Sequence, residues 1–260
     1  MSTMNSVTEY GEFDEKFQET FELFKRNIES DEEVGASFAV YKDGKPIIDL
    51  YGGFQDRDKK ISWNKDTLVN VHSTSKGIVA MVVAKLIDNG DLELDKRVCD
   101  YWPEFSENGK NDIRVKTLLS HQAGLYGWRE PLDETDFYKW DYVCELLAKQ
   151  KPFHEPNKEI CYHPKTIGFL VGELIKRITK KSVGKNLHEL LSNPLDAKCF
   201  IGTPEIYHNN IAELISSESL RKAFSNPENV DNYMVTAFLN PANRTKTANT
   251  AESVSYTHLT

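Results

Sequence analysis

The chain has 260 residues, of which 39% are hydrophobic and 28% charged, and its formal net charge is −8 at pH 7. This composition is typical of a soluble globular protein with one large domain or two small ones. The acidic balance argues against a surface that binds nucleic acid or anionic membranes. No apolar run reaches the length of a membrane span, and the acidic N-terminus resembles neither a signal nor a transit peptide. A cytoplasmic location without a membrane span is therefore expected.

The first 53 residues are predicted to contain a helix and a hairpin. Residues 1–11 carry no periodic pattern and are expected to be disordered. Over residues 12–30, aromatic and aliphatic side chains recur at the spacing of one helical face. Residues 36–41 and 47–51 are predicted to form two paired strands. Asp43-Gly44 lies between them, and this dipeptide is a common two-residue hairpin turn.

A long apolar run follows a Ser-x-x-Lys pattern formed by Ser73 and Lys76. Every residue over 78–87 except Lys85 is apolar, which predicts a helix buried on all sides. Gly90 stands where a helix C-terminal glycine is common. Residues three apart in a helix share one face, so the serine and the lysine are expected to lie side by side.

These two side chains offer a specific chemistry. A serine hydroxyl is a weak nucleophile until a base removes its proton. Burial lowers the pKa of a lysine, because desolvation disfavours the charged ammonium, and a neutral lysine can act as that base. The N-terminus of the helix adds a positive potential that suits a developing oxyanion. The alternative is that Ser73 only caps the helix and Lys76 points into water, since Ser-x-x-Lys is a frequent pattern.

The remaining helices are predicted from apolar spacing. Residues 167–178 carry apolar side chains at steps of three and one, which indicates one clear amphipathic helix. A short helix is predicted over residues 112–119 and another over residues 187–191. Weaker patterns predict helices over residues 211–220 and 230–239.

His121 lies in a turn that also contains Gly124. A histidine can act as a general base near neutral pH. More often, a lone histidine in such a turn is a hydrogen-bonded structural residue, and this is the role expected here.

The cysteines have no metal-ligand spacing and no Cys-x-x-Cys pair. Free thiols are therefore expected at Cys99, Cys144, Cys161 and Cys199. The sequence implies no metal and no organic cofactor.

Three patterns occur in a fixed order along the chain. They are the Ser-x-x-Lys at Ser73, the sequence Leu-Leu-Ser-His-Gln-Ala-Gly-Leu at residues 118–125, and Tyr-His-Pro beginning at Tyr162. Together they resemble the β-lactamase-related serine hydrolases, which include class C β-lactamases, DD-peptidases and esterases. The chain most resembles the esterase-like branch, in which Tyr-His-Ala commonly precedes a Gly-x-Leu-x-Gly-Glu-Leu helix, here residues 168–174. The resemblance covers residues 17–202.

The resemblance implies a fold, a reaction and three catalytic residues. The fold would be α/β (α+β), with an antiparallel sheet flanked by helices and an inserted all-α region, over residues 12–253. Ser73 would be the acylated nucleophile, Lys76 would hold or take its proton, and Tyr162 would act as a second base, as a phenolate stabilised by Lys76. The substrate would be a small carboxylic ester or amide. Pro164 replaces the Asn or Ala of the family, which removes an amide from the substrate site. This weakens the resemblance to a true β-lactamase and is tolerable for an esterase.

A third family motif is expected on a C-terminal strand, as Lys-Thr-Gly, His-x-Gly or Trp-x-Gly. The nearest fragment is Lys246-Thr247-Ala248, in which alanine replaces glycine. A C-terminally truncated chain with a non-native tail over residues 254–260 is therefore expected. Losing one oxyanion donor slows a hydrolase by about a hundredfold to a thousandfold, so these 260 residues are expected to be poorly active.

A second class of function also fits the sequence. A non-catalytic scaffold or assembly protein could keep the same fold without using the serine. The two hypotheses differ in a Ser73→Ala variant, because only an enzyme would lose ester turnover. The retention of serine, lysine and tyrosine together favours the enzyme.

Overall fold

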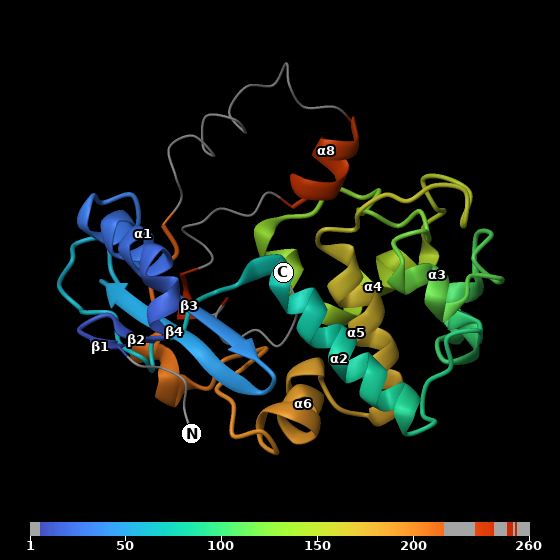
Figure 1. Cartoon of the computed structure of the whole chain (residues 1–260). Coiled ribbons are helices and arrows are strands. Elements are labelled where there is room, and N and C mark those ends of the chain that lie inside the picture. The colour runs from blue at the N-terminus through green and yellow to red at the C-terminus, as the bar shows by residue number, and fades with distance from the viewer. Residues whose placement is uncertain (1–5, 216–231, 242–248, 252, 254–260) are drawn as a thin grey trace. The chain divides into compact units, whose positions relative to one another are not determined.

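The computed structural model describes residues 6–215, 232–241, 249–251 and 253 (Figure 1). Contacts divide the chain into two compact units. The first consists of residues 1–70 and 206–215, and the second of residues 71–205 and 216–260. The single domain predicted over residues 12–253 stays a prediction. The predicted tail over 254–260 and the Lys-Thr-Ala fragment lie outside the described residues.

The first unit contains a four-stranded antiparallel sheet in the order β1-β2-β4-β3. The strands are β1 (Ser6–Thr8), β2 (Gly11–Phe13), β3 (Gly35–Lys42) and β4 (Lys45–Gly53). The prediction of disorder over residues 1–11 is therefore wrong for β1 and for the start of β2. A strand of three residues is too short to show an alternating pattern, and backbone pairing decides its structure.

The predicted hairpin of β3 and β4 is confirmed. Asp43 and Gly44 both have positive φ angles, 51° and 73°, as the tight two-residue turn of a twisted hairpin requires. Lys42 pairs with Lys45 directly beside this turn, and a bulge shifts the register between Val40 and Tyr41.

The predicted N-terminal helix is formed by η1 (Glu15–Phe17) and α1 (Gln18–Glu29). Asp14 begins it, because its carboxylate accepts a backbone hydrogen bond from the first turn at 3.2 Å. Phe21 stacks on Phe13 with ring centroids 4.6 Å apart, which holds the helix against the sheet. The apolar cluster of this unit consists of Phe13, Phe21, Ile48 and Leu50.

The described part of the second unit is mainly helical. Its α-helices are α2 (Ser75–Asp88), α3 (Val115–Leu119), α4 (Trp140–Lys149), α5 (Thr166–Thr179), α6 (Val183–Leu187) and α8 (Asn232–Phe238). Shorter helical turns are η2 (His72–Thr74), η3 (Val98–Asp100), η4 (Pro103–Ser106), η5 (Glu134–Tyr138) and the π-helical η6 (His188–Ser192). Among the described residues, no helix has both the length and the apolar character needed to cross a membrane.

Three of the predicted helices differ from those observed, and the one expected over residues 112–119 begins only at Val115. The helix expected over residues 187–191 begins earlier, as α6, because the Ser182 side chain accepts a hydrogen bond from the Lys185 N–H at 3.2 Å and caps its start. Of the helix predicted over residues 211–220, residues 216–220 lie outside the described residues, and residues 211–215 are not helical. Ile211 instead forms a parallel bridge to Leu68 after the turn η7 (Glu205–Asn210). A backbone bridge to a distant residue overrides a weak helical pattern.

The core of the second unit is centred on α5. Its first ten side chains, over Thr166–Ile175, are all buried, and the helix packs against α3, α4 and α6. The Phe169 ring contacts the rings of Trp128, Phe137 and Trp140. The Tyr-His-Pro segment directly precedes α5, so this buried helix fixes the place where that segment ends.

α2 is less buried than the sequence predicts. Val79, Val82, Val83 and Leu86 are buried, whereas Met81 is 49% exposed and Lys76 is half-buried. The exposed face also carries the small residues Gly77, Ala80 and Ala84. An apolar run predicts the helix but does not indicate which of its faces is covered, so it overstates burial here.

Two glycines in helices are expected to respond oppositely to alanine substitution. A Cβ at Gly172 would lie 2.6 Å from the Trp140 ring, so Gly172→Ala is expected to lower the free energy of unfolding by about 1–3 kcal/mol. A Cβ at Gly77 would meet nothing within 4 Å, so Gly77→Ala is expected to raise it by up to about 1 kcal/mol. Urea unfolding followed by tryptophan fluorescence measures both. Equal effects at the two positions would contradict the packing described for α5.

Candidate active site

Ser73 lies in η2, immediately before α2, and its side chain is exposed to solvent. Lys76 lies in the first turn of α2 and donates a hydrogen bond from Nζ to Ser73 Oγ at 3.1 Å. Tyr162 precedes α5 and donates its hydroxyl hydrogen to the same oxygen at 2.9 Å. The structure therefore brings together all three residues singled out in the sequence, although 89 positions separate the tyrosine from the serine.

The arrangement places two proton-carrying groups on one hydroxyl oxygen. The Lys76 Nζ also lies 5.4 Å from the centre of the Tyr162 ring, within the range of a cation–π contact. Each group is close enough to Ser73 to exchange a proton with it directly. The N-terminal end of α2 adds the positive end of the helix dipole beside the serine. The site can thus move a proton away from the serine and stabilise negative charge near it.

His121 supports Tyr162 from the other side. Its ring centroid lies 5.0 Å from that of Tyr162, and its Nδ1 accepts a hydrogen bond from the backbone N–H of His163 at 3.0 Å. Burial, and secondarily the charge of Lys76, lowers the pKa of His121. A neutral imidazole that accepts at Nδ1 carries its proton on Nε2. His121 is a hydrogen-bonded residue, as predicted, but its contact with the tyrosine was not predicted.

His163 is fully buried next to Tyr162. Its Nε2 accepts a hydrogen bond from the backbone N–H of Leu125 at 3.1 Å, and its Nδ1 faces the carbonyl of Cys161. Burial lowers the pKa of His163 to about 3, so the ring is neutral near pH 7. A neutral histidine joins two chain segments here by one accepted and one donated hydrogen bond.

This burial makes the stability of the protein depend on pH. The pKa of His163 is about 3 in the folded chain and about 6.5 when unfolded, so between these values the unfolded state binds more protons. The contribution of the buried neutral ring to the free energy of unfolding is complete above about pH 6.5. It is lost as the pH falls from there towards about 3. As the pH is lowered from 6 to 4, the free energy of unfolding is expected to fall less steeply in His163→Gln than in the wild-type chain. The two slopes are expected to differ by about 1 kcal/mol per pH unit. Urea unfolding at several pH values measures the slope.

The matched control for this prediction is His188→Gln. His188 is exposed on η6, so its replacement is expected to keep the wild-type slope. Parallel slopes for His163→Gln and the wild-type chain would show that the buried ring does not couple folding to protonation.

A C-terminal segment also holds Tyr162. The Tyr233 hydroxyl, on α8, donates to the backbone carbonyl of Tyr162 at 2.7 Å. Lys165 is buried, and its Nζ donates to the carbonyls of Phe238, at 2.7 Å, and Pro241. Burial lowers the pKa of Lys165 to about 8. The roles of Tyr233 and Lys165 were not predicted from the sequence, in which the one sign is that Lys165 directly follows the Tyr-His-Pro motif.

Two residues at this site have a strained backbone. His72 has φ 46° and His121 has φ 60°, a left-handed conformation that is uncommon for residues other than glycine. His72 precedes the serine, and His121 contacts the tyrosine. Strain of this kind persists where surrounding structure imposes it, and it is frequent at active sites.

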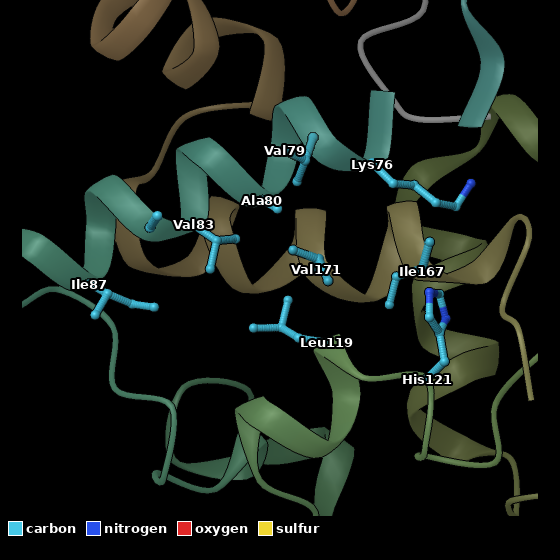
Figure 2. Close-up of a pocket in the computed structure, with 10 residues that line it drawn as sticks. Lys76, Val79, Ala80, Val83, Ile87, Leu119, His121, Ile167 and Val171 are labelled. Carbon is cyan, nitrogen blue, oxygen red and sulfur yellow. The ribbon is translucent and has the colours of Figure 1, made fainter. Parts of the chain in front are cut away.

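A cavity of about 220 Å³ opens beside Lys76 and His121 (Figure 2). It is bounded by α2, by α5 and by Leu119 at the end of α3. Apart from the lysine and the histidine, the side chains that line it are aliphatic. The candidate site thus joins a polar cluster to an apolar recess.

Comparison with known proteins identifies the family. The family model described as Beta-lactamase matches residues 22–248. The chain belongs to the beta-lactamase family. The fold and the resemblance expected from the three motifs are therefore confirmed.

A relative and a solved structure similar to this chain carry hydrolase names. The chain is 33% identical over 188 residues to "Esterase/beta-lactamase LipL" of Mycobacterium tuberculosis, covering 72% of this chain and 43% of LipL. Among solved structures, it is similar to a family VIII carboxylesterase, with a TM-score of 0.82 and 36% identity over 91% of this chain. A penicillin-binding protein homologue from Caulobacter crescentus gives a TM-score of 0.77 with 33% identity, over 88% of this chain. The chain spans 62% and 64% of these two structures, and less than half of LipL.

Proposed function

We propose that the chain carries the catalytic serine of an ester hydrolase that works through an acyl-enzyme. The observation that carries the proposal is the convergence of Lys76 Nζ and the Tyr162 hydroxyl on the exposed oxygen of Ser73. A nucleophile with proton-accepting groups in hydrogen-bond reach is the signature of covalent catalysis. Membership of the beta-lactamase family supports the same reaction class.

In the acylation step, Ser73 Oγ forms a bond to the acyl carbon of the ester. The lysine–tyrosine pair takes the serine proton when it lacks one proton of its own, on either the lysine nitrogen or the tyrosine oxygen. As the ester C–O bond breaks, the pair returns a proton to the leaving alkoxide. An alcohol departs, and the acyl group remains on the serine.

In the deacylation step, water attacks the acyl carbon and loses a proton to the same pair. The bond from the acyl carbon to Ser73 Oγ breaks, and the serine regains its proton. The products are a carboxylic acid and the free serine. We infer that the positive potential at the start of α2 stabilises the negative charge that develops in both steps.

Esters are proposed in preference to β-lactam amides. Pro164 follows Tyr162 and His163 and offers no side-chain amide to bind a substrate carbonyl. The similarity to a family VIII carboxylesterase supports this preference.

The experiment that tests this function compares an ester with a β-lactam. The wild-type chain is incubated with p-nitrophenyl butyrate and, separately, with nitrocefin, and product release is followed by absorbance. Ester turnover that exceeds nitrocefin turnover is the expected result. Turnover of neither compound, with the chain folded by circular dichroism and Ser73 unlabelled by a fluorophosphonate probe, would favour the scaffold hypothesis.

A further inference from the structure

The cavity beside the candidate site is polar at one end and apolar along the rest of its length. Figure 2 shows Lys76 and His121 at one end and Ile87 at the other, with Val171 and Ile167 of α5 facing α2. From Lys76 to Ile87, α2 advances about 16 Å, at about 1.5 Å per residue. The cavity is therefore elongated along the helix, and one of its ends reaches the lysine that contacts Ser73.

The chemistry of the walls selects an apolar occupant. No carboxylate lines the cavity among the described residues, and its two nitrogen-bearing side chains both lie at the end beside the serine. An ordered water needs two to four polar partners, which the aliphatic length does not offer. An unbranched hydrocarbon chain needs none.

We propose that this cavity binds the acyl chain of a medium-length aliphatic ester, with the ester carbonyl at Ser73. This inference rests on the proposed function, because it places the chain of the same substrate. An apolar cavity of about 150 Å³ accommodates benzene, so about 220 Å³ offers room for a chain of about eight carbon atoms. Octanoyl esters fit this volume, acetyl esters leave it empty, and longer chains exceed it.

Small side chains keep the solvent-facing edge of the cavity open. Ala80 and Ala84 both line it and are both exposed. A leucine at either position would extend into the volume that the chain occupies. Leucine is also a strong helix former, so the substitution leaves the helical propensity of α2 high. Met81 lies on the same helix, is exposed and does not line the cavity, so it offers a control position.

The first test measures binding without catalysis. Sodium butyrate, hexanoate, octanoate and dodecanoate are titrated calorimetrically into the Ser73→Ala chain. Affinity is expected to rise about threefold to fourfold per methylene up to octanoate and then to level off. Adding Ala84→Leu is expected to weaken octanoate binding at least tenfold, whereas adding Met81→Phe leaves it unchanged. Affinity that ignores chain length, or that Ala84→Leu does not change, overturns the proposal.

The second test measures turnover in the presence of Ser73. In Ala84→Leu, kcat/KM for p-nitrophenyl octanoate is expected to fall about tenfold, while that for p-nitrophenyl acetate stays at the wild-type value. Turnover without any chain-length preference overturns the cavity proposal and leaves the hydrolase proposal standing. Chain-length-dependent binding without turnover of any ester overturns the hydrolase proposal and leaves the binding of aliphatic chains in the cavity standing. Ala80→Leu is the second variant if Ala84→Leu does not fold by circular dichroism.

Discussion

Replacing Ser73 with alanine is expected to lower ester turnover by at least about a thousandfold, because the nucleophile is lost while the surrounding groups remain. The serine is exposed, so water can replace it as a partner for Lys76 and Tyr162, and the free energy of unfolding is expected to change little. The measurement is kcat/KM for p-nitrophenyl butyrate, together with a urea unfolding curve.

Ser75→Ala is the matched control for this substitution. Ser75 lies two residues further along the chain, at the start of α2, and contacts neither Lys76 Nζ nor the tyrosine hydroxyl through any hydrogen bond described at the site. Its replacement is expected to keep most of the activity. Equal losses in the two variants would point to damage of the helix start in place of a lost nucleophile, and unchanged activity in Ser73→Ala would exclude Ser73 from the chemistry.

Replacing Tyr162 with phenylalanine is expected to reduce kcat by about a hundredfold to ten-thousandfold. The substitution removes the hydroxyl that donates to Ser73 Oγ at 2.9 Å but keeps the ring that contacts His121. A positioned acid or base contributes a rate factor of this size. Because the hydroxyl is proposed to act in proton transfer, KM is expected to change much less than kcat. Steady-state kinetics with p-nitrophenyl butyrate separates the two constants.

Tyr142→Phe provides the control, since Tyr142 is exposed on α4 and lies outside the site. It is expected to retain wild-type kinetics. A Tyr162→Phe variant that keeps its kcat and loses only affinity would assign the tyrosine to substrate binding. That outcome would leave Lys76 as the single proton-accepting group on the serine.

The local sequence was sufficient to predict the geometry of those parts of the site whose residues lie close together in the chain. Ser73 and Lys76 are three residues apart at the start of a helix, and the helical repeat alone places them side by side. The Asp43-Gly44 turn was predicted in the same way, because the backbone of that dipeptide suits a tight hairpin. In both cases a few neighbouring residues determine the geometry.

Contacts between distant segments required either the family resemblance or the structure. Nothing in the spacing of Tyr162 and Ser73 indicates that they meet, and only the ordered motifs of the family did so. The hydrogen bonds of Lys165 to Phe238 and Pro241 could not be predicted, because the sequence alone does not distinguish a buried lysine from an exposed one. The burial of α2 was overestimated for a related reason: a run of apolar residues does not indicate which face of the helix packs against the rest of the protein.

The central claim is that Ser73 is acylated, and the most direct measurement locates a trapped covalent adduct. The wild-type chain is incubated with a fluorophosphonate probe for several hours, digested and analysed by tandem mass spectrometry. The account predicts a single phosphonylated serine at position 73, which forms more slowly in Tyr162→Phe and is absent in Ser73→Ala. A folded chain with no adduct, or with its adduct on another serine, would contradict the claim.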